Sequence, residues 1–401
     1  MDTTTDLLRK LPLDTFSEAW ARCPAHRWSD MRLVSAVAAA ITAPKQRPPS
    51  SFALHAPLEL LARAALLPRV APSARDLARQ QIAAIASRYA AEGPEITLLS
   101  PTFATPRHAQ EALLAALRDG DADGCNGALE FLLKALPLWQ LRAALVDVLT
   151  PQLGAAAHTP ILLAALPRFV HAIPGLGGLL HAPLRSVARQ ADLQLTWHTQ
   201  PSPEGGTDAD PADILWQRLA QVPAWALAST AIAPTLLAVQ NNGMAARLLA
   251  GPCQTLTVPQ AQRVLLRLAA LSMLQDTPQH APYGWTHCLS LPQAVLANAD
   301  ASRDPQALVA IAATHVLAFR ATLGTVALEV SDVIADPQIS VTALASHAAT
   351  HPDAHLAKYT LACLDAADND LQAAPLFLAA AAHLGRWWKT QDASHSLGMR
   401  S

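Results

Sequence analysis

Histidine inside apolar sequence is the feature of this chain with the most chemical potential. The chain has fifteen histidines, and five of them lie in Ala/Leu-rich stretches: His55, His181, His287, His315 and His355. An imidazole on an apolar helix face needs a hydrogen-bond partner, because an unpaired buried polar group costs stability. A satisfied core histidine is an adequate explanation for any one of them. As a group, we expect His55, His181, His287 and His355 to converge on one internal cavity.

A lysine accompanies the last of these histidines. His355 and Lys358 are three residues apart, so on a helix they share one face. Burial and a neighbouring imidazole would lower the pKa of this lysine and give an acid/base pair that works near neutral pH. The alternative is a surface lysine near the start of a helix.

A second group of histidines has the spacing of metal ligands. His347 and His351 are four residues apart and can bind one metal ion from a single helix. His355 continues the spacing, but Pro352 breaks the register before it. No carboxylate or cysteine lies on the same helix at a spacing that would complete the ligand set. His347 and His351 are therefore the metal candidates if a metal is bound.

The common catalytic and nucleotide-binding motifs are missing. Gly175, Gly177 and Gly178 lie in IleProGlyLeuGlyGlyLeuLeu, without the preceding strand that a dinucleotide fingerprint requires. The sequence contains no Gly-x-Ser-x-Gly elbow and no His-Glu-x-x-His motif. It also lacks the paired Glu-x-x-His motifs of di-iron bundles.

The elements that must position these histidines are helices. Hydrophobic residues make up 51% of the 401 residues and charged residues only 15%, with Ala and Leu, the best helix formers, carrying the burial. Helix starts with proline at the first turn recur, as at Thr105-Pro106, Asp210-Pro211 and Asp304-Pro305. We therefore predict an all-α fold: one large helical domain of many short, Pro-punctuated helices around an Ala/Leu-rich core with an internal cavity. Residues 1–45 form an N-terminal helical extension, and residues 199–210 a flexible loop.

Charge and hydropathy exclude several classes of protein. The net charge is −2 and no basic run is present, so nucleic-acid binding is not expected. The uncharged stretch from Leu219 to Ala246 is interrupted by Pro223 and Pro234, which favours broken buried helices over a membrane span. Five scattered cysteines and the lack of an apolar leader favour reduced thiols in the cytoplasm.

Taken together, the histidine segments resemble the questin oxidase family. The resemblance lies in four segments in order along the chain: LeuHisAlaProLeuGluLeuLeuAlaArgAla (Leu54–Ala64), HisAlaProLeuArgSerValAlaArgGln from His181, TrpThrHisCysLeuSerLeuProGlnAlaVal from Trp285, and HisLeuAlaLysTyrThrLeuAlaCysLeu from His355. They extend over about residues 50–388. Pro57 and Pro183 depart from the family pattern.

The resemblance implies an oxygenase of natural-product metabolism. Members of the family are associated with oxidative, Baeyer–Villiger-type cleavage of aromatic polyketide rings, with molecular oxygen and NADPH. They lack a flavin-binding Rossmann motif, as this chain does. His55, His181, His287, His355 and Lys358 are then the expected catalytic residues. Their roles are proton abstraction, oxyanion stabilisation or metal ligation, among which the sequence does not decide.

Two alternatives remain open. The chain is also compatible with a histidine-bound metal hydrolase or lyase, and with a non-catalytic helical scaffold or partner protein of a biosynthetic pathway. The expected partner is a small-molecule substrate, with a homodimer or a pathway protein as a further option. Stoichiometric iron, copper or zinc in the purified chain would favour an enzyme, and the identity of the metal would separate oxygen chemistry from hydrolysis.

Overall fold

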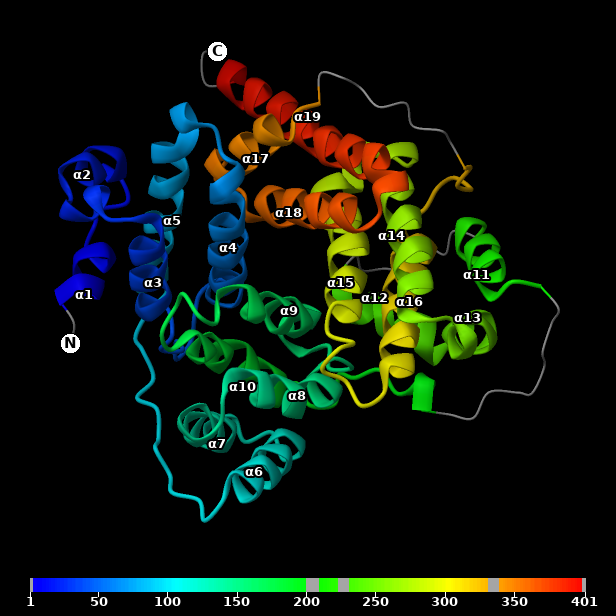
Figure 1. Cartoon of the computed structure of the whole chain (residues 1–401), viewed down its shortest axis with the longest axis horizontal. Coiled ribbons are helices and arrows are strands. Elements are labelled where there is room, and N and C mark those ends of the chain that lie inside the picture. Colours follow the sequence, from blue (N-terminus) through cyan, green and yellow to red (C-terminus); the bar gives the residue numbers. More distant parts are fainter. Residues whose placement is uncertain (1–2, 200–208, 223–230, 331–338, 399–401) are drawn as a thin grey trace. The chain divides into compact units, whose positions relative to one another are not determined.

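The computed structural model describes residues 3–199, 209–222, 231–330 and 339–398, with side chains up to residue 394. Within these residues the chain holds nineteen α-helices and no β-strand, which confirms the predicted all-α fold (Figure 1). Contacts gather into two compact units, unit 1 (Met1–Gln194 with Ala301–Arg303) and unit 2 (Leu195–Asp300 with Asp304–Ser401). The expectation of one helical domain remains a prediction. Residues 200–208 of the predicted loop lie outside the described residues.

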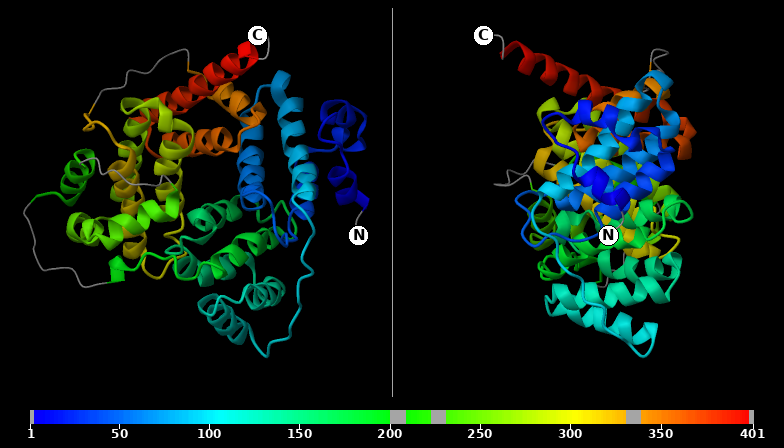
Figure 2. Two further views of the ribbon diagram at one scale, coloured as in Figure 1. Left: turned by 180° about the vertical axis from the view of Figure 1, so that it is seen from behind. Right: turned by 90° about the vertical axis from the view of Figure 1, so that its left-hand side faces the viewer.

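Unit 1 contains the first ten helices. They are α1 (Thr3–Arg9), α2 (Phe16–Arg22), α3 (Asp30–Ala40), α4 (Phe52–Leu66), α5 (Arg75–Ala91), α6 (Pro106–Arg118), α7 (Ala122–Ala135), α8 (Leu138–Leu149), α9 (Thr159–Phe169) and α10 (His181–Ala188). α3 packs against α4 and α5, while α6 and α7 pair with each other at one end of the unit (Figure 2). α10 packs on α7, and His181, the first residue of α10, faces α7.

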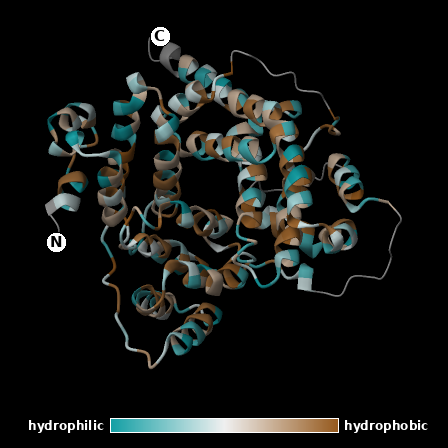
Figure 3. Ribbon diagram, viewed as in Figure 1, coloured by the Kyte–Doolittle hydropathy of each residue, from teal (hydrophilic) through white to brown (hydrophobic). Residues whose placement is uncertain are grey.

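Unit 2 contains the other nine helices. They are α11 (Pro211–Ala220), α12 (Ile232–Asn241), α13 (Met244–Thr255), α14 (Val258–Gln275), α15 (Thr286–Leu296), α16 (Pro305–Leu323), α17 (Val341–Thr350), α18 (Ala354–Asn369) and α19 (Ala374–Gly398). α14, α15 and α16 pack against one another, and α18 packs on α15 and α19. Apolar residues run along most helices of both units (Figure 3).

The helix starts follow the predicted Pro-led pattern. Thr105 caps α6 by accepting the backbone N–H of His108 at 3.2 Å, with Pro106 in the first turn. Asp304 caps α16 in the same way, accepting the N–H of Ala307 at 3.0 Å. Thr257 and Gln260 form a reciprocal capping box at α14. Each device satisfies N–H groups that have no partner inside the helix, so these boundaries were readable from local sequence.

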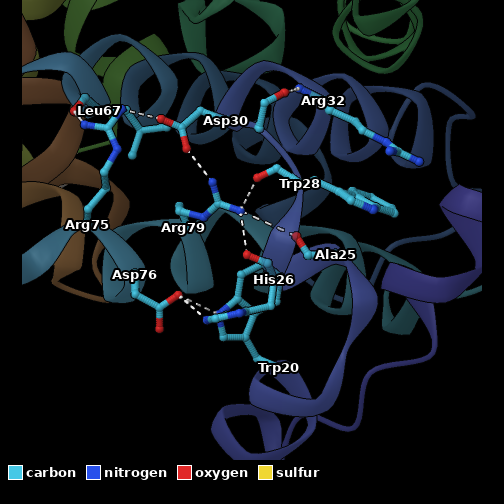
Figure 4. A network of polar contacts seen from close by, with 11 residues as sticks. Trp20, Ala25, His26, Trp28, Asp30, Arg32, Leu67, Arg75, Asp76 and Arg79 are labelled. Carbon is cyan, nitrogen blue, oxygen red and sulfur yellow. Dashed lines mark hydrogen bonds and ion pairs between the residues drawn. The ribbon is translucent and has the colours of Figure 1, made fainter. Parts of the chain in front are cut away.

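The N-terminal helical segment is tied to α5 by a polar network (Figure 4). Asp30, in the first turn of α3, accepts hydrogen bonds from Arg75 and Arg79 of α5. Arg79 also donates to the backbone carbonyls of His26, at 3.0 Å, and Trp28, at 2.7 Å. Charge-assisted bonds to several acceptors at once fix the register of the segment on the helix. The segment holds α1, α2 and α3, and the helical extension expected over residues 1–45 stays a prediction.

A buried ion pair closes the end of α16. Arg320 and Asp276 have fully buried side chains, with 3.1 Å between guanidinium and carboxylate. Asp276 also accepts hydrogen bonds from the backbone N–H and the hydroxyl of Thr325, at 2.9 and 2.8 Å. Buried charges are tolerated when paired and fully hydrogen-bonded, so this carboxylate holds the chain after α16 against the end of α14.

α16 is the one described helix with the length and hydropathy of a membrane span. Its apolar window is 83% buried inside the protein, and it carries His315 and Arg320 within that interior. Burial of this kind is typical of the central helix of a packed core. In the stretch from Leu219 to Ala246, the described residues form the end of α11, then α12 and the start of α13, as separate helices.

Candidate functional site

His287 of unit 2 is held in one defined tautomer. It follows a single π-helical turn, η8 (Ala281–Trp285), and lies in the first turn of α15. Its Nδ1 is hydrogen-bonded to the backbone carbonyl of Tyr283. A carbonyl only accepts, so Nδ1 must carry the proton and donate. The Nε2 atom of the neutral imidazole therefore has a lone pair and can act as a base or a ligand.

His355 lies beside this base. Its ring centroid is 5.3 Å from that of His287, with the two planes at 80°. The ring of Tyr283 meets His355 edge-on at 4.9 Å, and Phe319 of α16 stacks on His287 at 6.3 Å. Tyr283 is 55% exposed, whereas His287 is buried. The site thus has a buried base, a second imidazole and an aromatic ring that reaches solvent.

Asp353 supplies the negative charge of the site. Its Oδ1 accepts the backbone N–H groups of His355 and Leu356, at 2.7 and 3.2 Å, and so caps α18. The same Oδ1 lies 3.5 Å from Nδ1 of His355. Burial alone would raise the pKa of Asp353, but the hydrogen bonds and charge of His355, with the backbone N–H groups, bring the pKa below its usual value. Asp353 is therefore a carboxylate at neutral pH.

Lys358 follows one turn after His355 on α18 and is buried, with 9% of its surface exposed. The expected i, i+3 pair is therefore on a helix, and the alternative of a surface lysine is wrong. Among the residues predicted from sequence, His287, His355 and Lys358 belong to this part of unit 2. Asp353 and Tyr283 were missed. The Asp353 position has the ordinary signal of a helix N-cap, an acidic residue just before an apolar helix.

His55 lies in unit 1 and pairs with a histidine that the sequence argument passed over. Its ring meets that of His158 edge-on, with 4.9 Å between centroids. His158 is buried, and its Nδ1 is bonded to the carbonyl of Ala155 at 3.2 Å, so here too Nε2 has the lone pair. The preceding turn is unusual, because Ala155, Ala156 and Ala157 all adopt left-handed φ angles of 52–56°. His158 therefore lies in the same kind of Ala-rich sequence as the histidines that were predicted to be functional.

His181 pairs with a carboxylate instead. Its Nε2 lies 3.3 Å from Glu130 of α7, and burial lowers the pKa of His181 in spite of that carboxylate. One turn along α10, Arg185 bonds to Asp123 of α7. Asn126 lies between these two ion pairs on α7, fully buried, with neither amide atom hydrogen-bonded within the described residues. The contact between α7 and α10 inside unit 1 therefore contains two ion pairs and a buried amide.

Two of the four histidines that were predicted to converge on one cavity lie side by side. His287 and His355 come together in unit 2, while His55 and His181 have other partners in unit 1. Convergence of all four remains a prediction, since the two pairs belong to different units.

The metal candidates have a different local role. His347 and His351 have ring centroids 5.8 Å apart, and His351 lies against Trp388 of α19. Nδ1 of His351 accepts the backbone N–H of Asp353 at 3.0 Å, so in the neutral ring the proton is on Nε2, which faces Asp392 at 3.4 Å. In this tautomer His351 offers a metal ion no lone pair, and a metal site at His347 and His351 stays a prediction. In the described part of the chain, no three His, Cys, Asp or Glu residues are grouped as metal ligands.

The glycine-rich segment does not fit a phosphate group. Gly177 and Gly178 lie in the 3-10 turn η5 (Leu176–Leu180), where an added Cβ would meet the side chain of Leu133 at 2.2 Å and that of Thr42 at 3.1 Å. These glycines therefore allow close packing of side chains and do not form an open cradle. The segment Leu176–Leu180 is therefore not a binding loop for the NADPH that the resemblance implies.

Comparison with known proteins adds no family assignment. No protein-family model, curated protein or solved structure matches the chain.

Proposed function

We propose that the chain is an enzyme in which His287 abstracts a proton from a small or medium-sized organic substrate. The observation that supports this most directly is the hydrogen bond from Nδ1 of His287 to the Tyr283 carbonyl. It fixes the tautomer and the ring orientation, which is how proteins prepare a histidine for general-base catalysis. His355, 5.3 Å away, offers a second imidazole for proton transfer.

The substrate class we propose is an aromatic compound with an acidic hydroxyl group. A phenol has a pKa of about 10, so a histidine base can deprotonate it once the anion is stabilised in the site. Tyr283, more than half exposed beside His355, offers an aromatic surface on which a planar ring can pack, and Phe319 stacks on His287 inside the core. A phenolate is electron-rich at its ring carbons and is the form that reacts with molecular oxygen.

The reaction we propose is the oxygen-dependent, Baeyer–Villiger-type or related oxidation of that compound in natural-product metabolism. This step rests on the resemblance to the questin oxidases. Such a monooxygenation places one oxygen atom in the product and reduces the other to water, with two electrons from NADPH. Because the described glycine-rich segment does not fit NADPH, no step of the proposal is assigned to residues that would hold it.

Oxygen consumption tests the proposal. Hydroxylated anthraquinones and related phenolic polyketides would be incubated with the full chain and NADPH, with an oxygen electrode and mass spectrometry of the products. Replacing His287 with Ala should abolish turnover while far-UV circular dichroism and the melting transition stay close to wild type. His108→Ala, an exposed residue of unit 1, is the matched control and should keep full activity. Full turnover by the His287→Ala variant would overturn the proposal.

A further inference from the structure

We propose that Asp353 is a positioning residue that makes His355 the acid partner of the base His287. This inference rests on the proposed function. It stands on the geometry of one oxygen atom, Oδ1 of Asp353. That atom accepts the backbone N–H of His355 at 2.7 Å and lies 3.5 Å from Nδ1 of the same residue.

The carboxylate of Asp353 is held in place by groups other than the imidazole of His355. Two backbone N–H groups at the start of α18 bind Asp353, and the positive end of the helix dipole favours its negative charge. The backbone of Asp353 is fixed as well, because its N–H donates to Nδ1 of His351 at 3.0 Å. His351 in turn packs on Trp388 of α19. The histidine predicted as a metal candidate thus holds the carboxylate in place.

A fixed carboxylate determines what the two imidazoles can do. Asp353 stabilises the protonated form of His355 on the Nδ1 side, which leaves the Nε2–H of that ring as a donor. His287 presents the complementary group, because its Nδ1–H is used by the Tyr283 carbonyl and its Nε2 accepts. One ring is therefore set to give a proton and its neighbour to take one. An acid and a base side by side are what removal of one substrate proton and delivery of another require.

The other titratable groups around His355 either oppose its protonation or have no effect on it. Lys358 lies one turn further along the same helix, where a positive charge opposes protonation of His355 and the charge of Asp353 favours it. Tyr283 of η8 meets the ring edge-on; its pKa is raised by burial and by Asp353, so it is neutral at physiological pH. His287 of α15 is the neighbouring ring. His351, the residue that follows α17, accepts the backbone N–H of Asp353, and Asp392 of α19 faces His351.

The matched pair of variants is Asp353→Asn and Asp353→Ala. Asparagine caps a helix about as well as aspartate, so Asp353→Asn removes the charge and keeps the cap, whereas Asp353→Ala removes both. NMR titration of the imidazole signals of full-length protein should show the midpoint of His355 falling by about one pH unit in Asp353→Asn. Circular dichroism and the melting transition should stay at wild-type values in Asp353→Asn and fall in Asp353→Ala.

Turnover reports the catalytic consequence separately. If His355 is the acid, the rate declines as pH rises through its midpoint, so Asp353→Asn should move the alkaline limb of the kcat profile to lower pH by the same amount, with KM little changed. An unchanged His355 midpoint in Asp353→Asn would overturn the pairing itself. A shifted midpoint with an unmoved pH profile would overturn its catalytic use, while the His287→Ala result tests the proposed function independently.

Discussion

The burial of His315 in the core of unit 2 allows a quantitative prediction of how the free energy of unfolding depends on pH. It lies in the middle of α16 with 1% of its surface exposed, and its Nδ1 has no hydrogen-bond partner within the described residues. Burial lowers the pKa of His315 to about 3. The residue is therefore neutral in the folded protein down to strongly acidic pH, whereas in the unfolded chain it takes up a proton near its ordinary pKa of about 6.5.

The sign and size of the effect follow from proton linkage. Between pH 6.5 and pH 3 the unfolded state binds one more proton at His315 than the folded state, so the free energy of unfolding decreases as pH falls. Each pH unit in this window lowers it by about 1.4 kcal/mol. From pH 7.5 to pH 4.5, His315 alone should therefore remove about 3 kcal/mol. The burial-lowered pKa values of His181, His198, His347 and His383 act in the same direction.

Two substitutions isolate this contribution. His315→Leu and His315→Gln both remove the titration, so urea unfolding followed by circular dichroism at pH 7.5, 6.0, 5.0 and 4.5 should show a pH dependence shallower than wild type by about 3 kcal/mol overall. At pH 7.5, His315→Leu should be as stable as wild type or more stable, because it removes a buried polar atom that has no partner. His315→Gln keeps a buried polar group and should be less stable than His315→Leu. Parallel pH dependences for wild type and His315→Leu would refute the reasoning.

Three further results are expected. Asp276→Ala should lower the free energy of unfolding by about 3–5 kcal/mol in urea titrations, because Arg320 remains buried without its counter-charge, and adding Arg320→Met should restore much of the loss. Ala156→Gly should raise stability by about 1 kcal/mol, against the usual effect of glycine, because Ala156 has a φ of 52°; an equal or lower melting temperature would contradict the strain. All five cysteines are buried, and burial raises the pKa of Cys253 to about 12, so a thiol reagent should react with none of them in the native protein and with five after denaturation.

Local sequence predicted the helices well because their ends are local events. Thr105, Thr257 and Asp304 cap helices through hydrogen bonds that span three residues, so composition and spacing contain the whole cause. The π-helical turn η8 and the left-handed turn before α9 were not foreseen, since neither is favoured by its own residues. Both are closely packed against other parts of the chain: an added Cβ would lie 2.7 Å from the backbone of Val187 at Gly154 and 2.4 Å from the side chain of Leu323 at Gly284.

The site was predicted in part for the same reason. Buried histidines are visible in sequence as polar residues in apolar runs, and His287 and His355 do meet. Which histidines meet depends on helix packing, for which the sequence gives no distance. His181 illustrates this, because its partner Glu130 lies 51 positions earlier on α7. His158 was not among the predicted residues, although it directly follows Ala155, Ala156 and Ala157 in an apolar run.

The geometry of the imidazole ring explains why buried histidines divide into two kinds here. The ring nitrogens point in different directions, so a backbone carbonyl three or four residues earlier can bind Nδ1 but leaves Nε2 to be met by something else. His158 and His287 both have this local bond, and each has a second imidazole beside it. His315 lacks a partner at Nδ1, and burial holds it neutral. The local bond at Nδ1 fixes the tautomer of His158 and His287, whereas the burial of His315 makes the stability of the fold depend on pH. Unit 2 contains both kinds, and the neighbour of His287, His355, has the carboxylate of Asp353 3.5 Å from its Nδ1.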